Sequence, residues 1–120
     1  MDNLEVIFYD LPDGSFPAMD FIDSLPFKLS AKTYRTIGLL ETEGANLREP
    51  YSKHLEDGIF ELRTELGSDI SRVLFFFVIR NKAVLTNGFL KKTQKTPRAE
   101  IEKAKKYRNE YLSRRCDHDI

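Results

Sequence analysis

Apolar and polar residues alternate along the first fifty residues in patterns that predict one strand and two helices. Residues 4–9 are β-branched and aromatic and stop at a cluster of turn-forming residues, which is typical of a strand. After Pro17 the apolar positions recur at helical spacing, and they predict a short helix that ends at Pro26. A second helical pattern predicts a helix from Ser30, as its cap, to about Glu43.

The middle of the chain predicts three further strands after a connecting loop at 45–57. Residues 59–66 alternate between apolar and polar, as a strand with one buried face does. Residues 70–80 are apolar on both parities, so both faces of this strand should be covered and it should lie at the centre of a sheet. A tight turn at 81–82 leads to a partner strand at 83–90, in which Gly88 marks a possible bulge.

The last element is predicted to be a helix with Thr96 as its cap and Pro97 in its first position. Residues 116–120 are predicted to form a flexible tail, which leaves one domain over 1–115. The order of elements is then βααβββα. This order predicts an α+β fold in which helices pack on a twisted antiparallel sheet.

Composition restricts the class of protein but not its activity. The chain has 120 residues, of which 41% are hydrophobic and 32% charged, which is typical of a globular domain. Its longest apolar run, 73–79, is too short to span a bilayer, and the N-terminus lacks a basic secretory flank. A single cysteine cannot form an internal disulfide. We therefore expect a cytoplasmic protein with no membrane association.

The net charge of zero hides a strong asymmetry. Residues 1–60 carry 5 basic and 11 acidic side chains, whereas residues 61–120 carry 14 and 8. From 70 to 99 there are seven basic residues and no acidic one. One interpretation is that the basic half meets an anionic partner, and the other is that the two halves neutralise each other in the fold.

The sequence offers no convincing metal or cofactor site. The metal-ligating candidates Cys116, His118 and Asp119 fall in the predicted tail, where nothing would fix a tetrahedral geometry. Neither a Gly-rich phosphate loop nor a GxSxG motif is present. We therefore expect no metal and no cofactor.

The basic residues of the predicted strands are the candidates for chemistry. Arg63 should project from the sheet face opposite Phe60 and Leu62, and Arg72 opens the central strand. Cations that converge on one face bind phosphates and stabilise the transition state of phosphodiester cleavage. For lysines at strand ends, the alternative is that they are solvated and deter edge-to-edge pairing. The acid-free stretch and its loop supply further candidates for binding RNA: Arg80, Lys82 and Lys95.

Four motifs between Tyr51 and Ala104 carry a family resemblance. They are a Lys-x-Leu segment at 53–55, a Glu-Leu-Arg strand at 61–63, an Arg-aliphatic-aromatic strand from Arg72, and a Phe-x-Lys-Lys-Thr segment at 89–93 before Pro97. In this order and spacing, the chain resembles the phage-related HigB branch of the RelE/ParE toxin superfamily. The resemblance implies a toxin of a type II toxin–antitoxin system that cleaves mRNA on the ribosome without a metal.

The resemblance also assigns roles by position. Arg63 and Arg72 would hold the scissile phosphate, and Lys91, supported by Lys92, would stabilise charge or protonate the leaving group. Lys53 would bind the RNA backbone. Relatives carry a His or Tyr pair near the end of the last strand, where this chain has Phe89 and no histidine.

The general base is therefore unassigned. His54 is the only imidazole in the motif region, and the alternative for it is a structural or merely exposed histidine. Tyr51 and a lysine of lowered pKa are further candidates.

The implied partners are mRNA on the ribosome and a cognate helix-turn-helix antitoxin, and the toxin–antitoxin complex often binds its own operator DNA. A different class remains open, because ParE-type members of the superfamily are non-enzymatic poisons of DNA gyrase and a shared fold does not fix function. The set formed by Arg63, Arg72 and Lys91 favours the nuclease.

Overall fold

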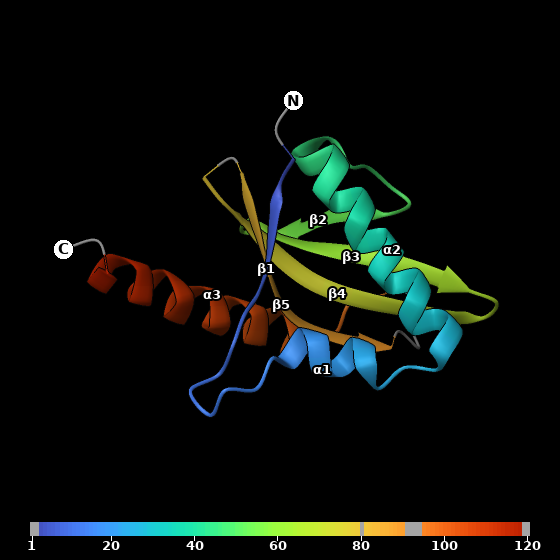
Figure 1. Cartoon of the computed structure of the whole chain (residues 1–120), viewed down its shortest axis with the longest axis horizontal. Coiled ribbons are helices and arrows are strands. Elements are labelled where there is room, and N and C mark those ends of the chain that lie inside the picture. The colour runs from blue at the N-terminus through green and yellow to red at the C-terminus, as the bar shows by residue number, and fades with distance from the viewer. Residues whose placement is uncertain (1–2, 80, 91–94, 119–120) are drawn as a thin grey trace.

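A five-stranded sheet with helices on both faces forms the domain (Figure 1). The computed structural model describes residues 3–79, 81–90 and 95–118, with side chains up to Arg114. The elements are β1 (Glu5–Phe8), α1 (Pro17–Asp23), α2 (Phe27–Glu43), a 3₁₀ turn (Gly44–Asn46), β2 (Ser52–Glu56), β3 (Ile59–Leu66), β4 (Asp69–Val78), β5 (Lys82–Leu90) and α3 (Arg98–His118). The α+β class is confirmed.

The sheet order is β1-β5-β4-β3-β2, which places β4 at the centre as predicted. Two details differ from the prediction. The loop expected at 45–57 contains the edge strand β2, which pairs with β3. In addition, β1 runs parallel to β5 while the other pairs are antiparallel, so the sheet is mixed. Helices α1 and α2 intervene between β1 and the hairpin strands, and this long connection allows the parallel pairing.

The two parities of β4 supply two separate cores, which explains why both are apolar. Val73 and Phe75 pack against α1 and α2 on one face of the sheet. Leu74 and Phe76 belong to the other core, which Ala104 of α3 completes. The helices therefore lie on opposite sides of the sheet, two on one face and one on the other (Figure 1).

Three helix boundaries differ from the sequence prediction. Helix α2 begins at Phe27 with Pro26 at its cap, and the Ser30 N–H already bonds to the Pro26 carbonyl inside the first turn. Helix α3 begins at Arg98, and the Thr96 hydroxyl donates to a side chain of β3 instead of capping the helix. The same helix continues to His118, beyond the boundary predicted at residue 115.

The predicted bulge in β5 lies two residues away from Gly88. The register between β4 and β5 shifts between Leu74 and Phe75, which leaves Thr86 as the extra residue. Gly88 itself pairs with Val73, and a Cβ atom there would lie 2.3 Å from Cδ2 of Phe21 in α1. The missing side chain is thus what lets α1 approach the sheet.

This contact predicts opposite effects for two glycine-to-alanine changes. Gly88→Ala should lower the free energy of unfolding by about 1–3 kcal/mol, because the new methyl group overpacks against Phe21. Gly38→Ala, inside α2 with open space around it, should raise that free energy by about 0.5–1 kcal/mol. Urea unfolding of both variants measures the difference, and equal shifts would contradict the close approach of α1.

Candidate functional site

A cavity of about 900 Å³ opens between the β2–β3 hairpin and the start of α3. It combines strand residues that are distant in sequence with the segment that enters α3. The residues that line it are Lys53, His54, Leu55, Glu56, Glu61, Arg72, Lys95, Thr96, Pro97, Arg98 and Ile101. Its volume is in the range of small-ligand sites, and four cationic side chains line it against two carboxylates.

Two charged residues of this cavity are buried, Glu61 and Arg72. They share one face of the sheet because Arg72 is the direct cross-strand partner of Arg63, and Arg63 follows Glu61 by two residues. One guanidinium nitrogen of Arg72, Nη1, donates to Oε2 of Glu61. The other carboxylate oxygen, Oε1, accepts from the Thr96 hydroxyl. Glu61 therefore joins β3, β4 and the segment before α3.

Arg72 keeps donors beyond its bond to Glu61. Its Nε and Nη2 atoms are buried and form no hydrogen bond with the described residues. A guanidinium presents its N–H groups in a planar fork that matches two oxygens of a phosphate. Arg72 is thus oriented by one carboxylate, and two of its guanidinium nitrogens have no acceptor among the described residues.

The exposed cations of the cavity are Lys53, Lys95 and Arg98. Arg98 forms a bidentate pair with Glu56 at 2.5 Å and also contacts Glu102. Lys53 is paired in register with Glu61 across β2 and β3, so it lies on the same sheet face as Arg72. Lys53 and Arg72 therefore lie on one face of the sheet, with Lys95 and Arg98 on the segment that enters α3.

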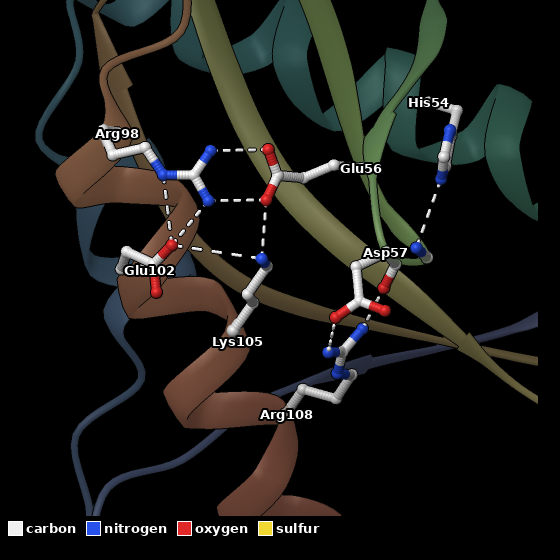
Figure 2. Close-up of polar contacts among 8 residues, drawn as sticks. His54, Glu56, Asp57, Arg98, Glu102, Lys105 and Arg108 are labelled. Carbon is white, nitrogen blue, oxygen red and sulfur yellow. Dashed lines mark hydrogen bonds and ion pairs between the residues drawn. The ribbon is translucent and has the colours of Figure 1, made fainter.

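Ion pairs fasten α3 to the tip of the β2–β3 hairpin and thereby fix one wall of the cavity (Figure 2). Glu56 is the centre of this network, since Lys105 Nζ also lies 2.6 Å from its Oε2. One turn further along α3, Arg108 Nη2 contacts Asp57 Oδ2 at 2.9 Å, and its Nη1 contacts the Asp57 carbonyl. Hydrogen bonds from Arg98 and Lys105 lower the pKa of Glu56 to about 2.

His54 makes a structural contact. Its Nε2 accepts the backbone N–H of Gly58 at 3.2 Å across the hairpin turn (Figure 2). Its ring meets Phe60 edge-on, with centroids 5.0 Å apart. These two contacts hold the ring between the hairpin turn and Phe60.

The remaining predicted site residues are spread more widely. Arg63 projects from the face opposite Phe60 and Leu62 as predicted, and its guanidinium lies 3.9 Å from both Glu49 and Glu61. Lys82 lies at the start of β5, and the cavity residue Arg72 pairs with Phe89 near the end of that strand. The two ends are about 23 Å apart, so Lys82 does not line the cavity. Arg80, Lys91 and Lys92 lie outside the described residues.

The sequence interpretation missed Glu61 and Thr96. In the sequence, Glu61 has the parity opposite Phe60, and this alternation predicts a solvated side chain. The signal was available in β4, whose second parity is apolar and therefore predicts a covered face. A carboxylate on a covered face needs a cation, and Arg72 has the register to supply one.

Two features are absent from the described part of the chain. It brings together no group of three or more His, Cys, Asp or Glu side chains that could hold a metal ion. None of its helices has both the length and the apolar character needed to cross a bilayer.

The lowered pKa of Glu56 predicts an acid-sensitive attachment of α3. The pKa of Glu56 falls from an ordinary 4.5 to about 2 on folding, so ionisation of this carboxyl group stabilises the folded state. This contribution should be complete above about pH 5 and should disappear as the pH falls through 2. Unfolding midpoints of the wild type and Glu56→Gln should therefore differ most near pH 6 and converge toward pH 2. A difference in midpoint that does not change with pH would contradict the claim that the charge of Glu56 holds α3 in place.

The family model described as "Phage derived protein Gp49-like (DUF891)" matches residues 20–109. The matched span includes every described residue that lines the cavity. No curated protein matches the sequence at a significant level. The chain belongs to the phage-derived Gp49-like family, a RelE-like family whose members are often toxin-like.

Proposed function

We propose that this protein is the toxin of a type II toxin–antitoxin system and cleaves mRNA on the ribosome without a metal. The observation that supports this most is the buried Arg72, held by Glu61 and lining a cavity with exposed lysines. Family membership supports the toxin class, and the resemblance to HigB-type toxins supports the nuclease within that class.

The proposed reaction needs charge stabilisation more than it needs a cofactor. The 2′-hydroxyl oxygen bonds to the adjacent phosphorus, and the bond from phosphorus to the 5′-oxygen breaks. The hydroxyl loses its proton, the departing oxygen gains one, and the products are a 2′,3′-cyclic phosphate and a 5′-hydroxyl end. The pentacoordinate intermediate gains negative charge, which fixed cations stabilise before the reaction begins.

In this proposal, the cations divide among three roles. Arg72 holds the scissile phosphate through the donors that Glu61 leaves available. Lys53 and Lys95 bind the RNA backbone at the exposed part of the cavity. Lys91 and Lys92, next to Lys95 in the chain, are proposed to stabilise charge and to protonate the leaving oxygen.

The proposed partners follow from the same class. A helix-turn-helix antitoxin would neutralise the protein by covering the cavity or by moving α3, which forms one of its walls. The complex of the two would bind operator DNA through the antitoxin. Only the resemblance to HigB-type toxins supports these partners.

Expression in cells without an antitoxin tests the proposal. The wild type should arrest growth and produce transcripts with 5′-hydroxyl ends. Lys53→Ala with Lys95→Ala should reduce the frequency of these ends by about 10-fold or more, because two backbone contacts are lost. Sequencing of 5′-hydroxyl ends in total RNA gives the measurement.

The matched control is Lys28→Ala with Lys106→Ala, which removes the same charge from exposed sites outside the cavity. It should cut messages at the wild-type rate. Equal loss in both double variants would show a general effect of charge and would contradict the site. Double-strand DNA breaks with intact mRNA would instead favour a ParE-like poison of DNA gyrase.

A further inference from the structure

A second cavity, of about 490 Å³, lies beside strand β2 and shares two residues with the first. Its lining combines two aromatic rings, two cations, one carboxylate and small or apolar side chains. The residues are Ala45, Leu47, Arg48, Glu49, Ser52, Lys53, His54 and Phe60. The shared residues are Lys53 and His54, so the two cavities meet at this strand.

The register of β2 explains how one strand can serve two cavities. Lys53 is paired with Glu61 and faces the α3 side of the sheet, whereas His54 is paired with Phe60 and faces the other side. The sheet order ends at β2, so no further strand among the described residues covers this edge. An extended chain can therefore cross the edge of the sheet and contact Lys53 on one face and His54 on the other.

The contacts of His54 suit its ring for stacking. The bond from the Gly58 N–H to Nε2 and the edge contact with Phe60 fix the orientation of the ring. The side chain is exposed, and so are the cations Arg48 and Lys53 beside it. A rigid aromatic ring next to cations is the combination with which proteins hold bases of single-stranded RNA.

We propose that the second cavity binds a nucleobase of single-stranded RNA, with His54 as the stacking platform and Arg48 on the adjacent backbone. This proposal deepens the proposed nuclease function and rests on it for the identity of the ligand. The phosphate next to the stacked base would enter the first cavity past Lys53. His54 then acts in substrate selection instead of as the general base considered from the sequence.

Two replacements of His54 separate the contribution of its aromatic ring from that of its Nε2 acceptor. His54→Phe keeps an aromatic ring but loses the acceptor for the Gly58 N–H. His54→Gln keeps an acceptor but loses the ring. Arg35→Ala, on the exposed side of α2 and outside both cavities, is the control for a lost charge.

The probe is a short single-stranded RNA that contains 2-aminopurine and uncleavable 2′-O-methyl riboses, because stacking quenches its fluorescence. Titration with the purified full chain should show quenching by the wild type, His54→Phe and Arg35→Ala. His54→Gln should bind about 10-fold more weakly and lose the quenching. Arg48→Ala should bind several-fold more weakly. Urea unfolding shows whether each variant is folded.

Each other outcome has a definite meaning. Quenching retained by His54→Gln, or absent from the wild type, overturns the stacking site. Loss in His54→Phe but not in His54→Gln assigns the residue to the turn alone. Normal RNA binding by every variant, with loss of neutralisation by an antitoxin, makes the cavity a protein-binding surface instead. If the titration shows stacking but cells contain no 5′-hydroxyl ends, the base-binding site is supported and the proposed cleavage is contradicted.

Discussion

The carboxylate of Glu61 is the contact on which the geometry of the site depends. It is completely buried, and its two oxygens bind groups from different parts of the chain, Arg72 of β4 and Thr96 before α3. A buried carboxylate without partners would be strongly unfavourable, so β3, β4 and the approach to α3 must meet at this point. The cavity lies where they meet, between the hairpin and the helix.

A buried ion pair of this kind is not explained by stability alone. Removing charges from water costs several kcal/mol per ion, and well-packed apolar residues often serve the fold as well or better. The pair of Glu61 and Arg72 has a different consequence, since it fixes a guanidinium in the lining of a cavity and leaves two of its nitrogens without an acceptor among the described residues. This arrangement fits a role in binding an anion.

The ion pairs around α3 account for part of the charge asymmetry in the sequence. Acidic residues of the first half bind basic residues of the second: Asp10 with Arg114, Glu49 with Arg63, Glu56 with Arg98 and Lys105, and Asp57 with Arg108. All of these pairs except that of Glu49 with Arg63 of β3 involve α3, so the two halves neutralise each other mainly along this helix. The cavity is lined from both halves, and Lys53 of the acidic half belongs to it. These ion pairs support the interpretation that the two halves neutralise each other, and an anionic partner of the basic half stays a prediction.

The sequence predicted the parts of the structure that depend on local pattern. The central position of β4 and the direction of Arg63 followed from alternation alone. The parallel pairing of β1 and the strand β2 did not, because pairing partners are set by tertiary contacts that no short window contains. Thr96 shows the same limit: its position before a helix predicts a cap, whose hydroxyl would accept a backbone N–H, but the buried Thr96 hydroxyl donates to Glu61.

The central claim is that the pair of Glu61 and Arg72 is present for chemistry and not for folding. The double variant Glu61→Gln with Arg72→Met tests it most directly, because it removes both charges together and the amide can still accept from Thr96. Sequencing of 5′-hydroxyl ends from cells that express this variant, with its urea midpoint as the check on folding, is the measurement. We predict a folded protein, at least about as stable as the wild type, that leaves messages intact. A folded double variant that still cuts mRNA at the wild-type rate would contradict the account.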